Sequence, residues 1–213
     1  DTVTVLTQDD PEALQPAFAM AGITSRATYL ARNLVNTPAR DLGPNDFAAC
    51  AKDMAGRIPG LECEVLDEAT MVEERMGLHL AVGQGSDESP CVVLLEWTPL
   101  GREAGFDLAM VGKGVTYDSG GYNLKPGRSM ATMFSDMGGG AATLAAITAI
   151  ATAGLKVNVV AVVPLAEKMV SGGAYRPGDI LQSRKGLTVE IVNTDAEGRL
   201  ILADALTYAA ELD

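Results

Sequence analysis

Three apolar runs of strand length, separated by segments with helical periodicity, constrain the fold of this chain most strongly. The runs cover residues 91–97, 107–112 and 158–165. Continuous apolar runs of this length are typical of strands that are buried on both faces of a sheet. Helical patterns between such strands predict an α/β fold with a mixed, mostly parallel sheet that helices flank on both faces.

The remaining elements follow from apolar periodicity and from the residues that start and stop helices. The expected helices are residues 24–36, 45–57, 138–153 and 201–212. Thr24 or Ser25 is placed to cap the first helix, and Asn45 is placed to cap the second. Residues 62–66 and 187–193 are expected to form two further strands.

The chain of 213 residues is long enough for one large domain with a sizeable core. Residues 1–22 show no strong pattern, so we expect residues 1–23 to be a linker or the remnant of an N-terminal domain. Residues 24–213 are then expected to form the folded α/β unit.

Composition narrows the class of function. The formal net charge is −12, which disfavours a protein that tracks nucleic-acid phosphates. No apolar stretch approaches the length of a membrane span, and the N-terminus has no basic region of a signal peptide. The cysteines Cys50, Cys63 and Cys91 match neither a metal pair nor a disulfide framework, and they are expected to be buried or half-buried thiols in a reducing compartment. These features together predict a cytoplasmic protein.

The octapeptide at residues 193–200, Asn-Thr-Asp-Ala-Glu-Gly-Arg-Leu, carries the strongest functional signal. Asp195, Glu197 and Arg199 alternate, so in an extended segment they would point to the same side. Two carboxylates on one side are costly to bury unless a cation lies between them. We therefore interpret the octapeptide as half of a metal site.

A second polar segment follows the apolar run at residues 107–112. Lys113 and Asp118 are expected at the end of that strand and in the turn after it, where Gly120 and Gly121 permit unusual backbone angles. The glycines around Lys113 also suggest a nucleotide-binding loop. Tyr117 stands where the dinucleotide fingerprint needs its third glycine, and the phosphate-loop pattern is missing as well. Ordinary turn glycines remain the other alternative.

Asp136 directly precedes an alanine-rich helical segment, where a helix N-cap is the simplest role for it. Its position relative to the other acidic segments favours a second role, as a metal ligand. His79 is the only histidine and lies in an apolar run, so we expect a structural histidine, and sites that need two histidines are excluded.

Four carboxylates, Asp118, Asp136, Asp195 and Glu197, thus belong to segments that end strands or start helices, with Lys113 and Lys125 nearby in sequence. A site built from carboxylates suits Mn²⁺, Mg²⁺ or Zn²⁺. Two divalent ions balance four carboxylates better than one ion does, as in known two-metal sites.

Several motifs, in the same order, resemble the leucyl (cytosol) aminopeptidase family of two-metal exopeptidases. They are NTDAEGRL at 193–200, VGKGVTYDSGG at 111–121, SDMGGG at 135–140 and AYRPGD at 174–179. The resemblance extends from about residue 27 to the end of the chain. It implies a metal-dependent aminopeptidase that removes N-terminal residues, preferably leucine-like, from peptides.

The resemblance also implies a role for each metal ligand. Lys113 and Asp136 would hold one divalent ion, and Asp195 would hold the other. Asp118 would contact both ions, and Glu197 would bridge them. An amine binds a metal only when it is deprotonated, and neighbouring cations lower its pKa.

Two further residues would act on the substrate. Lys125 would polarise the scissile carbonyl and stabilise the developing oxyanion. Arg199 would hold a bicarbonate ion, the general base toward a metal-bridging water, because a guanidinium binds planar oxyanions in a bidentate way. The family also implies a homo-hexamer.

The chain departs from the family pattern at four positions and in length. Tyr117, Phe134, Lys168 and Val170 replace a phenylalanine, a lysine, an asparagine and a proline, and the sequence offers no physical reason for these changes. The family continues beyond the octapeptide's helix and carries an N-terminal domain. Residues 24–213 are therefore expected to be the N-terminal part of a phosphorylase/hydrolase-like aminopeptidase catalytic domain. We expect weak metal binding and little activity from residues 1–213 alone. The alternatives are a non-catalytic metal-binding or DNA-binding regulatory relative, or an inactive fragment.

Overall fold

The structure is a computed structural model that describes residues 4–8 and 10–212. In these residues the main sheet contains β1 (Leu61–Leu66), β2 (Cys91–Trp97), β3 (Leu108–Val111), β4 (Gly114–Asp118) and β5 (Val159–Lys168). A separate hairpin pairs β6 (Ile180–Gln182) with β7 (Thr188–Glu190). The α-helices are α1 (Pro11–Asn36), α2 (Pro44–Gly56), α3 (Glu68–Glu73), α4 (Gly77–Gly83), α5 (Gly127–Met130), α6 (Gly138–Thr152) and α7 (Gly198–Ala210). Short 3₁₀ turns lie at η1 (Ala39–Asp41), η2 (Arg102–Ala104), η3 (Met133–Ser135) and η4 (Thr194–Ala196).

Strand β5 is the centre of the main sheet. It pairs antiparallel with β2 along one edge, and parallel with β3 and then β4 along the other. Because β1 is antiparallel to β2, strands β1, β3, β4 and β5 all run in one direction and β2 alone runs against them. Pro164, which has no N–H to donate, lies in the gap between the stretches of β5 that pair with β3 and β4. The predicted mixed, mostly parallel sheet is confirmed.

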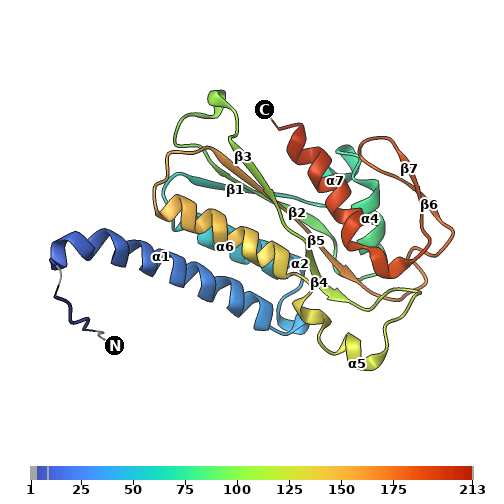
Figure 1. Ribbon diagram of the computed structural model, residues 1–213. Helices are drawn as coiled ribbons and strands as arrows, with labels where there is room; N and C mark the ends of the chain where they lie inside the picture. Colours follow the sequence, from blue (N-terminus) through green and yellow to red (C-terminus); the bar gives the residue numbers. More distant parts are fainter. Residues whose placement is uncertain (1–3, 9, 213) are drawn as a thin grey trace.

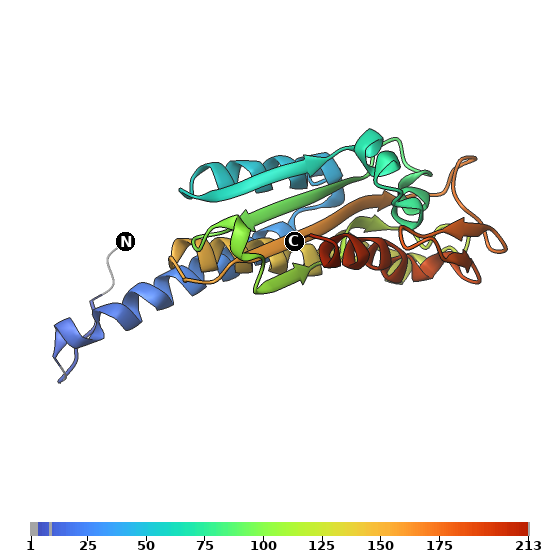
Figure 2. The ribbon, with the colours of Figure 1, turned by 90° about the horizontal axis from the view of Figure 1, so that it is seen from above.

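Both faces of the sheet are covered by helices, as predicted (Figures 1 and 2). Alternate residues of β5 divide between the two faces, as the two-residue period of a strand requires. Val159, Ala161 and Val163 belong to the core that includes α2 and α6, whereas Val160 and Val162 belong to the core that includes α7. This double burial explains why β5 is apolar without alternation.

Helix α1 differs from the prediction, because it begins at Pro11 rather than near Thr24. Its N-cap is Asp10, whose side chain accepts a hydrogen bond from the backbone N–H of Glu12. The helix therefore continues through most of the segment in which no pattern was expected. Figure 1 shows that its N-terminal part extends away from the body of the protein.

Three local predictions were wrong. Asn45 does not cap α2, because the N-cap is Gly43, whose N–H donates to Asp46 Oδ2 at 3.0 Å. Strand β4 was not predicted, and it makes Asp118 the last residue of a strand rather than part of a turn. The strand expected at 187–193 shrinks to β7, with only three residues.

His79 is structural, as expected. Its side chain is completely buried, and Nε2 donates to the carbonyl oxygen of Leu165 at 2.9 Å. Burial lowers the pKa of His79 to about 4, so the ring is neutral at pH 7. The buried carboxylate of Asp204 accepts hydrogen bonds from the backbone N–H groups of Leu78 and His79, which ties α7 to the start of α4.

Within residues 4–8 and 10–212, no helix is both long enough and apolar enough to cross a membrane. All three cysteines are free; Cys91 is buried, and Cys50 and Cys63 are partly buried.

Candidate metal centre

The site begins where two parallel strands end side by side. Asp118 ends β4 and Lys168 ends β5, and the two residues are partners in the strand register. Both side chains are buried. Parallel strands bring their carboxyl ends to the same edge of a sheet, which is where ligand sites of α/β proteins form.

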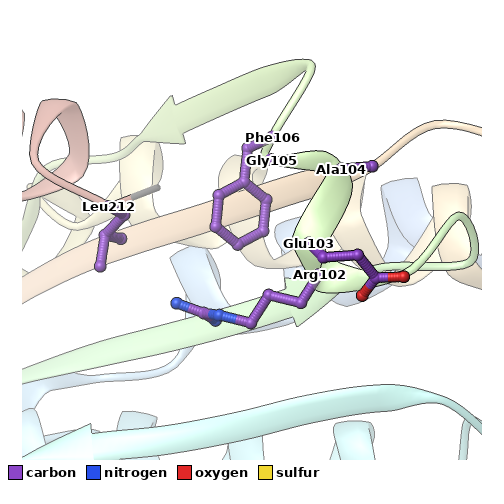
Figure 3. A pocket seen from close by; sticks show the side chains of 6 residues that line it. All are labelled: Arg102, Glu103, Ala104, Gly105, Phe106 and Leu212. Atoms are coloured by element: carbon purple, nitrogen blue, oxygen red, sulfur yellow. The ribbon is translucent and has the colours of Figure 1, made fainter.

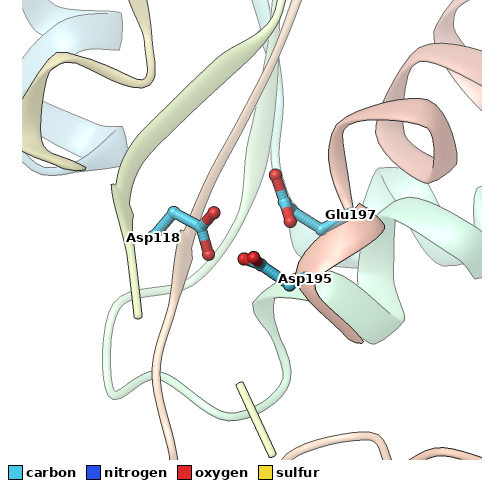
Figure 4. Close-up of side chains that lie close together, drawn as sticks. All are labelled: Asp118, Asp195 and Glu197. Atoms are coloured by element: carbon cyan, nitrogen blue, oxygen red, sulfur yellow. The ribbon is translucent and has the colours of Figure 1, made fainter. Parts of the chain in front are cut away.

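The octapeptide brings two more carboxylates to this edge. Thr194 anchors it, because its Oγ1 donates to the carbonyl oxygen of Gly120 at 2.7 Å and its N–H donates to Asn123 Oδ1 at 2.8 Å. Asp118, Asp195 and Glu197 then each offer an oxygen within 4.8 Å of the others. Figure 4 shows the three carboxylates converging from β4 and from the turn before α7.

The octapeptide is not extended, so the geometric argument that aligned its side chains was wrong. Its middle forms the 3₁₀ turn η4, and α7 begins at Gly198. The carboxylates of Asp195 and Glu197 lie close together because this turn brings their side chains to the same side. Arg199, in the first turn of α7, is exposed and lines a separate hollow of about 340 Å³ with Val192 and other residues. Among the described residues, it forms no ion pair with the carboxylates.

Lys113 and Asp136 form the second side of the cluster. Lys113 Nζ lies 2.7 Å from Asp136 Oδ2 and 2.7 Å from Glu197 Oε1. Burial disfavours the ammonium of Lys113, but these two carboxylates outweigh burial and raise its pKa. Asp136 is not the N-cap of α6, because that position is Met137. Burial, with the charges of Glu197 and Asp118, raises the pKa of Asp136 despite its partner Lys113.

Lys125 approaches from the loop after β4. Its Nζ lies 3.0 Å from Asp118 Oδ2 and 2.6 Å from Asp195 Oδ1. Burial alone would lower the pKa of Lys125, but the two carboxylates raise it. Gly120 and Gly121 have φ values of 90° and 68°, which glycine adopts without strain, and they turn the chain back so that Lys125 N–H reaches Ser119 O.

Lys168 is one of the departures from the family pattern, and no role in the site was predicted for it. Its Nζ lies 2.5 Å from Asp118 Oδ1, 2.6 Å from Glu197 Oε2 and 2.8 Å from the carbonyl oxygen of Thr194. Burial would raise the pKa of Glu197, but the ammonium groups of Lys113 and Lys168 lower it to about 2. The sequence signal was a lysine at the end of a buried strand, where a charge needs a partner.

The donor atoms fit a divalent cation. Asp195 Oδ1 is a buried atom that contacts the ammonium of Lys125 at 2.6 Å. The side chain of Lys125 is 15% exposed, so it can turn toward water and leave this oxygen to an ion. Carboxylate oxygens at this spacing are the ligands that Mn²⁺, Mg²⁺ and Zn²⁺ accept, and Lys113 adds an amine once it is deprotonated.

A larger hollow lies elsewhere on the surface. It has a volume of about 740 Å³ and is lined by the 102–106 segment and Leu212. Figure 3 shows the Arg102 and Phe106 side chains in it, and the guanidinium carbon of Arg102 is 5.4 Å from the ring centre. It shares no lining residue with the carboxylate cluster, so the cluster is the better candidate site.

Fold and site together define an α/β protein with a cluster of carboxylates and lysines at the carboxyl edge of a mixed sheet. The sequence profile of the Cytosol aminopeptidase family, catalytic domain, matches residues 29–213. The chain belongs to this family.

Relatives support the assignment. The chain is 46% identical over 211 residues to a probable cytosol aminopeptidase of Corynebacterium diphtheriae, covering 99% of this chain and 42% of that protein. It is 53% identical over 181 residues to a probable cytosol aminopeptidase of Streptomyces griseus, covering 85% of this chain and 35% of that protein. The chain thus spans less than half the length of these relatives.

Solved structures agree. The bottromycin maturation enzyme BotP in complex with Mn superposes with a TM-score of 0.88 at 43% identity, covering 95% of this chain and 43% of that chain. The cytosol aminopeptidase of Coxiella burnetii gives a TM-score of 0.81 at 37% identity, covering 86% of this chain and 39% of that chain.

Proposed function

We propose that this chain carries the metal-binding centre of a metal-dependent aminopeptidase that removes N-terminal residues, preferably leucine-like, from peptides. The observation that supports this best is the convergence of Asp118, Asp195 and Glu197 within 4.8 Å beside two strand ends. Membership of the cytosol aminopeptidase family agrees with it.

Two groups of ligands are proposed for the metal ions. Lys113 and Asp136 would hold one ion, Asp195 would hold the other, and Asp118 and Glu197 would serve both. When bound, divalent ions polarise a peptide carbonyl and make water acidic enough to act as a nucleophile near neutral pH. Mn²⁺ or Zn²⁺ suits this donor set, and Mg²⁺ is a third candidate. The BotP structure in complex with Mn supports the first of these.

Two basic residues would act on the substrate. Lys125 would donate to the scissile carbonyl oxygen, because its side chain is 15% exposed at the rim of the cluster and can turn from Asp118 and Asp195. Arg199 would hold bicarbonate as the general base, since its exposed guanidinium is free to bind a planar anion. Its present position on a neighbouring hollow requires the side chain to turn toward the cluster.

Further parts of the proposal concern the whole protein. We propose a cytoplasmic homo-hexamer that acts on peptides and not on nucleic acid, in keeping with the net charge of −12. Residues 24–213 would be the N-terminal part of the catalytic domain. The proposed linker at 1–23 would then end within α1, because that helix continues from Pro11 to Asn36.

Replacement of Glu197 by glutamine tests the proposed activity. The variant keeps the shape of the side chain but loses the charge that faces Lys113 and Lys168. Hydrolysis of a leucyl chromogenic substrate is expected to fall by at least a factor of about 100. The control is Glu73→Gln, which removes an exposed carboxylate of α3. The assay uses this chain and any longer protein that contains it, and unchanged turnover by Glu197→Gln would refute the proposal.

A further inference from the structure

Lys168 occupies an unusual position inside the proposed metal centre. Its Nζ contacts three oxygens from two segments at 2.5 to 2.8 Å, namely Asp118 Oδ1 of β4 and, from the octapeptide, Glu197 Oε2 and the carbonyl of Thr194. Asp195 Oδ1 lies 3.8 Å away. The ammonium therefore faces all three carboxylates that converge at this edge of the sheet, in the place where a cation would bind.

The burial of Lys168 separates it from the other two lysines of the cluster. The side chains of Lys113 and Lys125 are 25% and 15% exposed, whereas that of Lys168 is 1% exposed. The first two can turn toward water and release their carboxylates to a metal ion. Lys168 cannot turn toward water in this way, because β5 fixes its backbone and the protein encloses its side chain.

The surroundings of Lys168 hold the ammonium in place. The carbonyl oxygen of Thr194 accepts hydrogen bonds both from Lys168 Nζ at 2.8 Å and from the buried hydroxyl of Tyr175 at 2.7 Å. A buried cation is stable only where oxygens satisfy its N–H groups, and here two carboxylates and this carbonyl do so. A divalent ion that displaced the ammonium would leave it buried without partners.

We infer that Lys168 takes the place of one divalent ion, so that this chain binds a single divalent ion, on the side of Lys113 and Asp136. This inference rests on the proposed function only in that the cluster is a metal site. It alters the proposed two-ion arrangement, because the ammonium group of Lys168 replaces the ion held on the Asp195 side.

Metal stoichiometry tests the inference without any measurement of activity. The metal-stripped 213-residue chain is dialysed against rising concentrations of Mn²⁺, and bound manganese per chain is measured by atomic emission. The wild type is expected to saturate at one Mn²⁺ over a range in which Lys168→Asn takes up two. Lys156→Asn removes an exposed lysine with the same change of charge and is expected to behave as the wild type does.

The possible outcomes separate this inference from the proposed function. Two Mn²⁺ ions bound with similar affinity by the wild type would overturn the inference and leave the metal centre standing. A Lys168→Asn variant that also stops at one ion would overturn it too, because the ammonium would not be what excludes the second ion. No binding to the wild type would overturn both proposals. If Lys168→Asn does not fold by circular dichroism, the stoichiometry of the wild type decides alone.

Discussion

Asp118 and Lys168 are register partners at the ends of β4 and β5, and their side chains form an ion pair at 2.5 Å. The register of β4 shifts between Val115 and Tyr117, an irregularity of the kind that re-aims the end of a strand. The pair is therefore set by backbone pairing, and it is not a chance meeting of flexible side chains.

Lys168→Met is expected to destabilise the metal-free chain. Removal of one partner of a buried ion pair costs about 3–5 kcal/mol, and here Asp118 and Glu197 would both lose a partner. Lys125→Met is the matched control, with a smaller expected loss because Lys125 is more exposed. Urea unfolding in EDTA measures both, and added Mn²⁺ should recover more of the loss in Lys168→Met. Equal stability of the two variants without metal would contradict the prediction.

His79 is expected to make the chain less stable in mild acid. Its pKa is lowered from 6.5 to about 4, so its contribution to stability is complete above pH 6.5 and is lost as the pH falls toward 4. The loss amounts to roughly 3 kcal/mol once the pH is below both pKa values. His79→Gln keeps a donor for Leu165 O but does not titrate in this range. The difference in unfolding free energy between wild type and variant should therefore change between pH 7 and pH 4, and a constant difference would refute this.

Two neighbouring glycines of α6 are expected to respond oppositely to alanine. A Cβ at Gly138 would meet only Val35 at 3.7 Å, so Gly138→Ala should stabilise the helix by about 0.5–1 kcal/mol. A Cβ at Gly140 would lie 2.7 Å from Val163 Cγ1 and 3.2 Å from the carbonyl of Lys113, and Gly140→Ala should cost about 1–3 kcal/mol. Thermal unfolding of the two variants checks the contrast. A change in stability of the same sign in both variants would show that close packing against β5 does not decide the effect of the added methyl group.

Arg199→Ala is expected to separate catalysis from metal binding. The side chain is exposed and forms no ion pair with the carboxylates among the described residues, so stability should change by less than about 0.5 kcal/mol and Mn²⁺ uptake should stay the same. Under the proposed function, the dependence of peptide hydrolysis on added bicarbonate should disappear. Loss of Mn²⁺ binding in this variant would show instead that Arg199 belongs to the metal shell.

The sequence predicted much of the fold because its central strands are buried on both faces. The apolar runs that became β2 and β5 have no other stable environment in a chain of this size. Strand β4 was not predicted because it is short and rich in polar residues, and it forms by pairing with β5, which is far away in the sequence. The N-terminal part of helix α1 was not predicted because it buries little apolar surface, so its sequence needs no periodic pattern of apolar residues.

The carboxylates of the site were predicted from their residue types, but the reason given for their meeting was wrong in one respect. Asp195 and Glu197 converge through the η4 turn and not through an extended strand. Arg199 was expected beside them, and the start of α7 instead directs it to another hollow. The contacts of Lys168 depend on the register of β4 against β5, which one sequence does not reveal.

The two ends of α1 have different environments, and this has a consequence for local unfolding. Residues 11–20 are almost all exposed, whereas Leu34 near the other end is buried in the core. An isolated helical stretch of this length is only marginally stable in water. Amide hydrogens there should therefore exchange with deuterium far faster than those around Leu34, so that a single continuous helix contains both some of the least and some of the most protected amides of the chain.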